Sequence, residues 1–488
     1  MRVLLIYSNQ TQDLILPAPI GLSYVASATR DAGHEVCFVD LLTARNPQVV
    51  LRTALEDFQP QVVGISVRNI DNVVHQRLQT HLDVLALFIA EIRAASDRYL
   101  PIVLGGPAIS ILGSAALRHL DADYAVRGEG EITFPALLAA LDAGRDPVDI
   151  VGVCTRNDPA LIDPSPSRLP TFAASGMQDW IDWAPYRRHG GTWAIQTKRG
   201  CPMPCNYCTY PDIEGHTFRR RTAVDVADEI EAVQRSVAPH SFEFVDSTFN
   251  LPETHALDIC EEIIRRGLKV NLTTMGINPR SVSSELFALM KRAGFNSMMI
   301  TPEAGNDTML CNLDKGFDMQ DVHRAARLAR ASGLHSTWFF MLGGPGETRA
   351  TVDETLRFVE TALRHPTFMS VFMTGIRMLP GTRLAQVHAE ADADLAQPVF
   401  YFSDQVSEAW MLSRVNQTIQ NQSNVVHAAD EGGSTVERAL HHVLYWMGVA
   451  PPYWRFYPQL LGFPLLHAMR RNNPSVGMLS EEHSVSTH

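Results

Sequence analysis

The chain has 488 residues, which is enough for about three domains of ordinary size. A composition of 45% hydrophobic and 19% charged residues excludes a disordered chain. The net charge of −12 and the lack of a basic stripe predict no nucleic-acid partner. No apolar run reaches the ~20 residues of a membrane span and no secretory signal opens the chain, so we expect a cytoplasmic protein.

Residues 1–145 alternate between apolar runs of strand length and amphipathic helical segments. The expected strands are 2–8, 35–40, 62–67, 101–106 and 123–129, and the expected helices are 19–33, 49–58, about 75–95 and 131–144. The apolar runs lack period-2 alternation, which is typical of strands buried on both faces. The pattern predicts an α/β domain with a Rossmann-like, doubly wound parallel sheet, which binds ligands beyond the carboxyl ends of its strands.

Residues 146–190 are rich in Pro, Asp and Ser, and we expect a linker with little regular structure. Residues 191–389 repeat a strand–helix unit about six times. The expected strands are 192–198, 241–248, 270–276, 296–303, 335–342 and 368–376. Thr222 and Ser283 stand where helix N-caps belong. The repeat predicts a partial (β/α)6 TIM-type barrel with its active site at the carboxyl ends of the strands.

Residues 390–488 form an aromatic-rich region that we expect to be mainly helical. Two roles are open for it: a cap that shapes a substrate pocket over the barrel, or an ordinary aromatic core. The segment FYPQLLGFPLLHAMRR (456–471) is also compatible with peripheral contact at a membrane surface.

Three cysteines follow the first expected barrel strand, in the segment KRGCPMPCNYCTYP. Cys201, Cys205 and Cys208 have the spacing C-x3-C-x2-C. Thiolates bind soft metals, and a zinc site here would need a fourth ligand such as His189 or His216. A [4Fe–4S] cluster with three thiolates would instead leave one iron open to a small molecule. We favour the cluster.

The other four cysteines are scattered, so we expect no disulfide framework and interpret them as small buried hydrophobes. They are Cys37, Cys154, Cys260 and Cys311.

The cysteine motif, with Tyr207 before its last cysteine, resembles the radical S-adenosylmethionine (SAM) superfamily. Further segments resemble that family in the order in which it carries them. These segments are FVDSTFN (244–250), MMITPEAGNDTML (298–310), LGGPGET (342–348) and LPGTRL (379–384). The resemblance implies a cluster on the three cysteines and SAM on its open iron. It also implies contacts to SAM from Tyr207, Asp246, Ser247 and Glu303.

The first domain resembles the cobalamin-binding domain of one radical SAM subgroup. The resemblance lies in segments 17–40, 103–110 and 123–137. The loop after the first strand has no histidine, so no lower histidine ligand to cobalt is expected from it. The residues that the resemblance places at cobalamin are Arg68, Asn69, Gly105, Gly106, Pro107 and Glu129.

Arg68 or Asn69 would face cobalt from below, and the arginine has no lone pair with which to ligate it. The glycines would let the backbone approach a bulky ligand. Other interpretations stay open: a surface or phosphate contact for Arg68, a strand-end turn for the glycines, and a favourable helix N-terminal position for Glu129.

The resemblance implies a cobalamin-dependent radical SAM enzyme. Such an enzyme would methylate an unactivated carbon of a small natural-product-type substrate through methylcobalamin and a 5′-deoxyadenosyl radical. Its electron donor would be a protein such as flavodoxin or ferredoxin. The alternatives are a radical rearrangement, cyclisation or oxidation with the same cofactors, and a non-catalytic cobalamin or iron–sulfur sensor. No catalytic acid or base is assigned; Tyr210, Trp338 and Glu347 are candidates by location alone.

Overall fold

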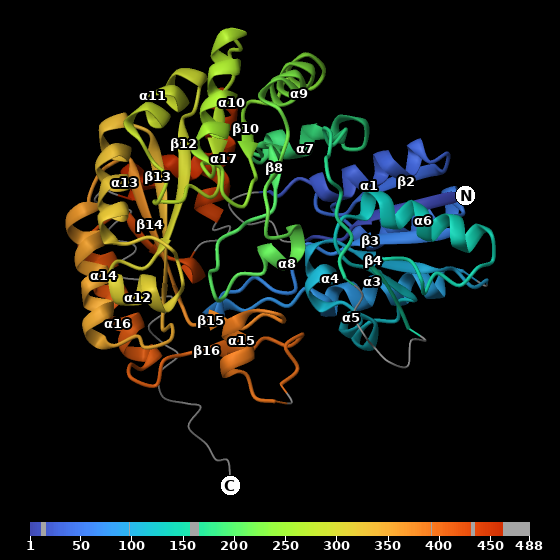
Figure 1. Ribbon diagram of the computed structural model, residues 1–488. Coiled ribbons are helices and arrows are strands. Elements are labelled where there is room, and N and C mark those ends of the chain that lie inside the picture. The colour runs from blue at the N-terminus through green and yellow to red at the C-terminus, as the bar shows by residue number, and fades with distance from the viewer. Residues whose placement is uncertain (11–15, 97, 157–164, 392, 431–434, 462–488) are drawn as a thin grey trace.

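The computed structural model describes residues 1–10, 16–96, 98–156, 165–391, 393–430 and 435–461. Two α/β units lie side by side in it (Figure 1). The first unit holds the N-terminus, and the second is a barrel-like arc of strands surrounded by helices. None of the helices in these ranges is long and apolar enough to cross a membrane.

The first unit is built on a six-stranded sheet in the order β2-β1-β3-β4-β5-β6. Its strands are β1 (Arg2–Tyr7), β2 (Glu35–Asp40), β3 (Val62–Ser66), β4 (Ile102–Gly105), β5 (Tyr124–Val126) and β6 (Val153–Thr155). The strands from β1 to β5 pair in parallel, as predicted, whereas β6 pairs antiparallel to β5. The segment 146–190 therefore contributes an edge strand to this sheet, which corrects the expectation of a linker with little regular structure.

Helices cover both faces of this sheet because the strand residues that point to each face are apolar. The helices are α1 (Ile20–Asp31), α2 (Pro47–Phe58), η1 (His75–Arg77), α3 (Leu82–Ala94), α4 (Pro107–Leu112), α5 (Ala115–His119) and α6 (Gly130–Asp142). Val3 and Leu5 pack in one hydrophobic cluster with α1 and α6, and Leu4 and Ile6 pack in another with α2 and α3. The doubly wound architecture is confirmed.

The second unit is an arc of parallel strands. They are β7 (Trp193–Ile195), β10 (Phe242–Phe244), β11 (Leu272–Thr274), β12 (Ser297–Glu303), β13 (His335–Leu342), β14 (Phe368–Thr374) and β17 (Val425–His427). Parallel bridges at Leu272–Phe295 and Ile277–Ile300 join the β7-β10-β11 group to the others. The six predicted strands are all present, and β17 adds a seventh from the region that was expected to be mainly helical.

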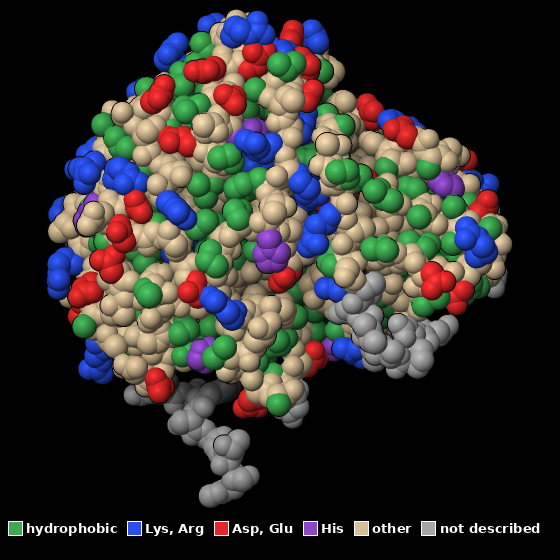
Figure 2. Space-filling view, in the orientation of Figure 1, with side chains coloured by type: hydrophobic (Ala, Val, Ile, Leu, Met, Phe, Trp, Pro, Cys, Tyr) green, Lys and Arg blue, Asp and Glu red, His purple; other side chains and the backbone are tan. Residues whose placement is uncertain are grey.

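Helices alternate with these strands around the outside of the arc (Figure 1). The longer ones are α9 (Ala223–Ser236), α10 (Glu253–Arg265), α11 (Ser284–Ala293), α13 (Met319–Ser332), α14 (Arg349–Ala362), α16 (Glu408–Asn421) and α17 (Thr435–Trp446). The predicted caps are confirmed: the Thr222 side chain accepts from the Asp225 amide, and Ser283 accepts from the Leu286 amide. Acidic and basic side chains are interspersed over the face shown in Figure 2.

Shorter elements complete the unit. They are η2 (Met177–Asp179), α7 (Trp183–Arg188), β8 (Lys198–Arg199), α8 (Tyr210–Glu214), β9 (Arg219–Arg220), α12 (Asp307–Asn312), β15 (Ile376–Arg377), α15 (Arg383–His388), β16 (Phe400–Tyr401), η3 (Ala428–Asp430), η4 (Tyr453–Phe456) and α18 (Tyr457–Leu461).

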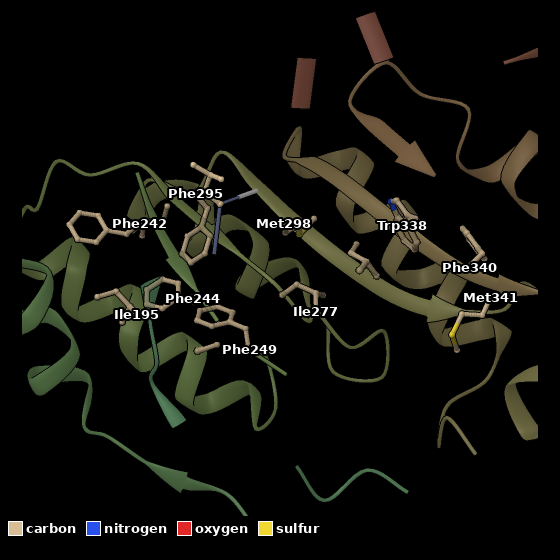
Figure 3. Packing of buried hydrophobic residues seen from close by; sticks show 14 of the residues in the cluster. Ile195, Phe242, Phe244, Phe249, Ile277, Phe295, Met298, Trp338, Phe340 and Met341 are labelled. Carbon is tan, nitrogen blue, oxygen red and sulfur yellow. The ribbon is translucent and has the colours of Figure 1, made fainter. Parts of the chain in front are cut away.

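A layer of large apolar side chains fills the space between the strands and the helices (Figure 3). Phe244 of β10 stacks on Phe249 and on Phe295, with ring centroids 4.9 and 5.6 Å apart. Because neighbouring strand residues point to opposite faces, the residues between these core positions point into the barrel. Cys154 and Cys260 are buried as expected, but Cys37 is half-buried and Cys311 is exposed, which corrects that prediction for Cys311.

The aromatic C-terminal segment closes the barrel at the amino ends of its strands. Trp454 and Tyr457 pack against interior residues of the barrel such as Met299 and Val371. The Asn296 amide, just before β12, donates to the carbonyl of Pro451 at 3.4 Å. This segment is therefore both a cap and an aromatic core, at the end opposite the cysteine loop. Most of the segment considered for membrane contact lies outside the described residues.

Candidate functional site

A cavity of about 790 Å³ lies where the two units meet. The carboxyl ends of β1, β3 and β4 provide one wall, through residues such as Tyr7, Ser66 and Gly105. The opposite wall comes from the carboxyl ends and interior of the barrel, with Gln196 and Val245 among its residues. The cavity therefore joins the two places where parallel α/β folds bind ligands.

On the first wall, two adjacent positions require glycine for different physical reasons. Gly106 has φ +98°, and a Cβ there would lie 2.7 Å from the carbonyl oxygen of Val67, so the backbone itself requires glycine. A Cβ on Gly105 would meet nothing within 4 Å, so it would project into open space at the cavity. The glycine at 105 keeps this space clear. Pro107 follows as the first residue of α4 and also lines the cavity.

Arg68 and Asn69 also line the cavity, in the loop that follows β3. That loop is fixed to the barrel by a buried ion pair. The Arg377 Nε donates to Asp71 Oδ2 at 2.8 Å, and the two side chains are 3% and 0% exposed. Arg377 also donates to the carbonyls of Met378 and Leu395. Sequence reasoning missed this anchor because its partners are 306 positions apart.

The three cysteines lie in the loop between β8 and α8, at the carboxyl end of the barrel. Gly200, which precedes them, has φ +93°, and a Cβ there would lie 2.1 Å from the carbonyl oxygen of Thr217. The Ser247 hydroxyl donates to the Gly200 carbonyl at 3.2 Å. Burial raises the pKa of the Cys201 thiol, and it raises that of Cys208 to about 12. Burial thus favours the neutral thiols, whereas a metal is bound by the thiolates.

The described residues contain no group of three or more His, Cys, Asp or Glu side chains arranged to hold a metal ion. The three cysteines of the loop therefore do not converge on one metal-ion position in this structure. A [4Fe–4S] cluster places each thiolate on its own iron, which suits cysteines spread along a loop. The donor set and its spacing fit the cluster.

Behind the cysteine loop lies a buried network centred on Asp246. Its carboxylate accepts from the Thr197 amide at 2.7 Å, from the Thr197 hydroxyl at 2.5 Å and from Lys198 Nζ at 3.3 Å. The side chains of Lys198 and Asp246 have no exposed surface. This network holds the start of the cysteine loop, and a direct contact of Asp246 with SAM stays a prediction.

Tyr207 and Glu303 come together around a lysine that sequence reasoning missed. Lys315 Nζ donates to the Tyr207 hydroxyl at 3.0 Å and lies 3.9 Å from Glu303 Oε1. Glu303 has φ +68° at an irregularity in β12, a strained conformation of the kind found at functional sites. Burial raises the pKa of Glu303, and the Lys315 charge opposes that effect. Contact of this cluster with SAM stays a prediction.

Glu129 is committed to arginines of the second unit. It lies 3.1 Å from Arg199 and 2.6 Å from Arg219, and it accepts from the Leu169 amide at 2.7 Å. Arg199 also lies 2.6 Å from Glu131. Although Glu129 lines the cavity, its carboxylate binds these arginines beside the cysteine loop. A contact of Glu129 with cobalamin stays a prediction.

The inner part of the cavity reaches into the barrel. Its wall includes Ala194, Glu243, Met275, Met299, Phe339 and Met373. Glu243 was missed by sequence reasoning, although its signal was present: an acidic residue between two phenylalanines in a strand that is otherwise apolar.

Of the three candidates by location, only Tyr210 lines the cavity. Trp338 is fully buried in the hydrophobic core, where its indole donates to the Ser336 hydroxyl. Glu347 is bound to Thr351 and to the amide of Gly343. Trp338 and Glu347 are therefore structural residues, which corrects their selection.

Comparison with known proteins agrees with this geometry. The family model described as the radical SAM superfamily matches residues 195–359, and the B12 binding domain matches residues 16–138. The chain belongs to the cobalamin-binding radical SAM family. A [4Fe–4S] cluster, SAM and cobalamin are the cofactors of this family. The cysteine loop fits the cluster, and the open space beside Gly105 fits cobalamin.

Two curated relatives align with most of this chain. The tryptophan 2-C-methyltransferase of Streptomyces laurentii is 28% identical over 453 residues, which are 80% of this chain and 74% of the relative. The methyltransferase PH0819 of Pyrococcus horikoshii is 27% identical over 355 residues, 70% of this chain and 73% of the relative. Among solved structures, the radical SAM methyltransferase TsrM from Kitasatospora setae has a TM-score of 0.80 at 22% identity, covering 96% of this chain and 99% of TsrM. That likeness shows the shared fold.

Proposed function

We propose that this protein is a cobalamin-dependent radical SAM methyltransferase that methylates an unactivated carbon of a small substrate. The observation that carries the proposal is the single cavity that joins the glycine wall of the first sheet to the barrel interior, with the cysteine loop beside it. A methyl donor and a radical generator have to act on the same substrate carbon, and a shared enclosed space lets both approach it.

In this proposal Cys201, Cys205 and Cys208 hold the cluster. Gly105 leaves room for cobalamin, and Arg68 faces that cofactor without ligating it, since a guanidinium has no lone pair to give. When bound, the cluster with SAM supplies hydrogen-atom abstraction and cobalamin supplies the methyl group. The apolar barrel interior excludes water and keeps reactive species from side reactions.

Each turnover would consume two SAM molecules. One would give its methyl group and end as S-adenosylhomocysteine, and the other would end as methionine and 5′-deoxyadenosine, which gains the hydrogen lost by the substrate. The balance requires two electrons from outside, so we also propose a low-potential donor protein of the flavodoxin or ferredoxin type.

A second candidate is a radical reaction without methyl transfer. The anaerobic magnesium-protoporphyrin IX monomethyl ester cyclase of Synechocystis is 27% identical over 332 residues, 66% of this chain and 64% of the cyclase. The two candidates differ in their SAM products: the methyltransferase yields S-adenosylhomocysteine together with 5′-deoxyadenosine, and the other reaction yields no S-adenosylhomocysteine.

The test is anaerobic reconstitution with iron, sulfide, cobalamin, SAM and a reductant, followed by metal analysis and quantification of both SAM products. We expect iron in the protein and both products. Cys208→Ala should lose the cluster, whereas Cys311→Ala, a change at an exposed cysteine outside the loop, should retain it. Zinc in the loop, or iron with neither SAM product, would contradict the proposal.

A further inference from the structure

The inner end of the cavity is mainly apolar and contains one carboxyl group, that of Glu243. Of the barrel-strand residues that line the cavity and that the structure describes, Glu243 alone is ionisable. Its neighbours there include the thioethers of Met275 and Met299 and the ring of Phe339. Thioethers and aromatic faces are electron-rich surfaces that attract cations.

The hydrogen bonds of this carboxyl group are only half used. The Thr192 hydroxyl donates to Glu243 Oε2 at 2.7 Å. No described residue donates to Oε1, although the residue is only 4% exposed. A buried carboxylate without a full set of donors is unfavourable until a ligand supplies one.

The other polar groups at this end of the cavity are already committed. Thr192 gives its proton to Glu243. The Gln196 amide donates to Glu214 at 3.0 Å, and its oxygen accepts from Arg199 at 3.0 Å. The barrel side of the cavity therefore presents an open acceptor rather than an open donor, and a ligand that matches this side has to donate.

We propose that Glu243 is the specificity residue of the substrate pocket and that it binds a nitrogen donor, an amine or ring N–H, on an otherwise apolar substrate. The inference rests on the proposed function, because it takes the inner cavity as the substrate site. Burial raises the pKa of Glu243, and the Thr192 hydrogen bond and the charge of Arg68, which lines the opposite wall of the cavity, oppose that effect.

The experiment compares three probes with one hydrocarbon body: 3-phenylpropylamine, 3-phenylpropan-1-ol and 3-phenylpropanoate. Their binding to the cobalamin- and cluster-loaded protein is measured by calorimetry. We expect the amine to bind at least about tenfold more tightly than the other two, as a charge-assisted hydrogen bond to a buried acceptor provides. In Glu243→Gln, the amine should lose about tenfold in affinity while the alcohol changes by less than about twofold.

Glu347→Gln is the matched control, because Glu347 is also a buried carboxyl group bound to a threonine but does not line the cavity. It should leave all three affinities unchanged. Absence of amine binding, equally tight binding of the carboxylate probe, or an amine preference that survives Glu243→Gln overturns the inference.

The SAM products, measured on the same samples, separate this inference from the proposed function. If the protein yields neither product but shows Glu243-dependent amine binding, the amine site is supported and the methyltransferase proposal is rejected. If the protein yields both products without an amine preference, only the amine site is rejected.

Discussion

Asp71→Asn tests whether the buried ion pair with Arg377 holds the cavity wall in place. Asp71 accepts a charge-assisted hydrogen bond from Arg377 Nε at Oδ2 and a backbone hydrogen bond from the Val73 amide at Oδ1. Whichever way the new amide turns, its N–H group faces another N–H group. Removal of one partner of a buried pair costs about 3–5 kcal/mol. Since Arg377 keeps two carbonyl acceptors, we expect the lower value of about 3 kcal/mol.

This loss should appear in cobalamin binding, because the same loop carries Arg68 and Asn69 to the cavity. If the loop has to be docked for binding, about 3 kcal/mol corresponds to a rise of roughly 100-fold in Kd. The assay is a titration of the protein with hydroxocobalamin, followed by quenching of tryptophan fluorescence, together with a thermal melt.

The control is Asp179→Asn, which breaks an ion pair with Arg30 in which both side chains are nearly half exposed. Exposed pairs contribute little, so its Kd should stay within about twofold of the wild type. Replacing both partners of the buried pair, Asp71→Leu with Arg377→Met, should be less harmful than Asp71→Asn alone because no charge is left unpaired. An Asp71→Asn protein with wild-type Kd and melting midpoint would refute the anchoring role.

Three further results are expected. Gly200→Ala should reduce the iron content severely, since its Cβ would lie 2.1 Å from the Thr217 carbonyl oxygen. Gly105→Ala, whose Cβ meets nothing within 4 Å, should keep its iron but bind cobalamin more weakly. Iron analysis and cobalamin titration check both variants. Burial raises the pKa of Glu347 from 4.5 to about 7, so the folded state loses stability as pH rises through that window. The melting midpoint of Glu347→Gln should therefore fall less between pH 5 and 8 than that of the wild type. Trp454→Ala, which empties the floor of the barrel, should destabilise the protein by about 3–5 kcal/mol and lower its melting midpoint.

Local patterns in the sequence predicted the long elements and the cysteine site. The strands of the barrel are apolar runs of sufficient length, and the caps at Thr222 and Ser283 are set by neighbouring residues. The cysteine spacing is likewise a local property. The strands β6 and β17 were missed because they lie outside the regular strand–helix alternation, in the Pro-, Asp- and Ser-rich segment and in the aromatic C-terminal region, and each pairs only because a sheet edge is available.

Side-chain roles that depend on distant partners could not be predicted. Asp246 and Glu129 were expected at cofactors, and their carboxylates also form ion pairs, with Lys198 and with the arginines beside the cysteine loop. The direction of each side chain is set by packing between units that are far apart in the sequence. Glu243 is different, because a lone acidic residue inside an apolar strand already indicated a polar position in the barrel interior.

The closure of the barrel by the last part of the chain has a consequence for its synthesis. Both β17 and the Trp454–Tyr457 plug are translated after all the other barrel strands. A nascent chain emerging from the ribosome therefore exposes the apolar edge of β14 and the bare amino end of the barrel until residues 425–457 have been translated. Premature termination even late in the message would leave those surfaces uncovered, so we expect such products to be cleared by the cell's quality-control proteases before they acquire a cofactor.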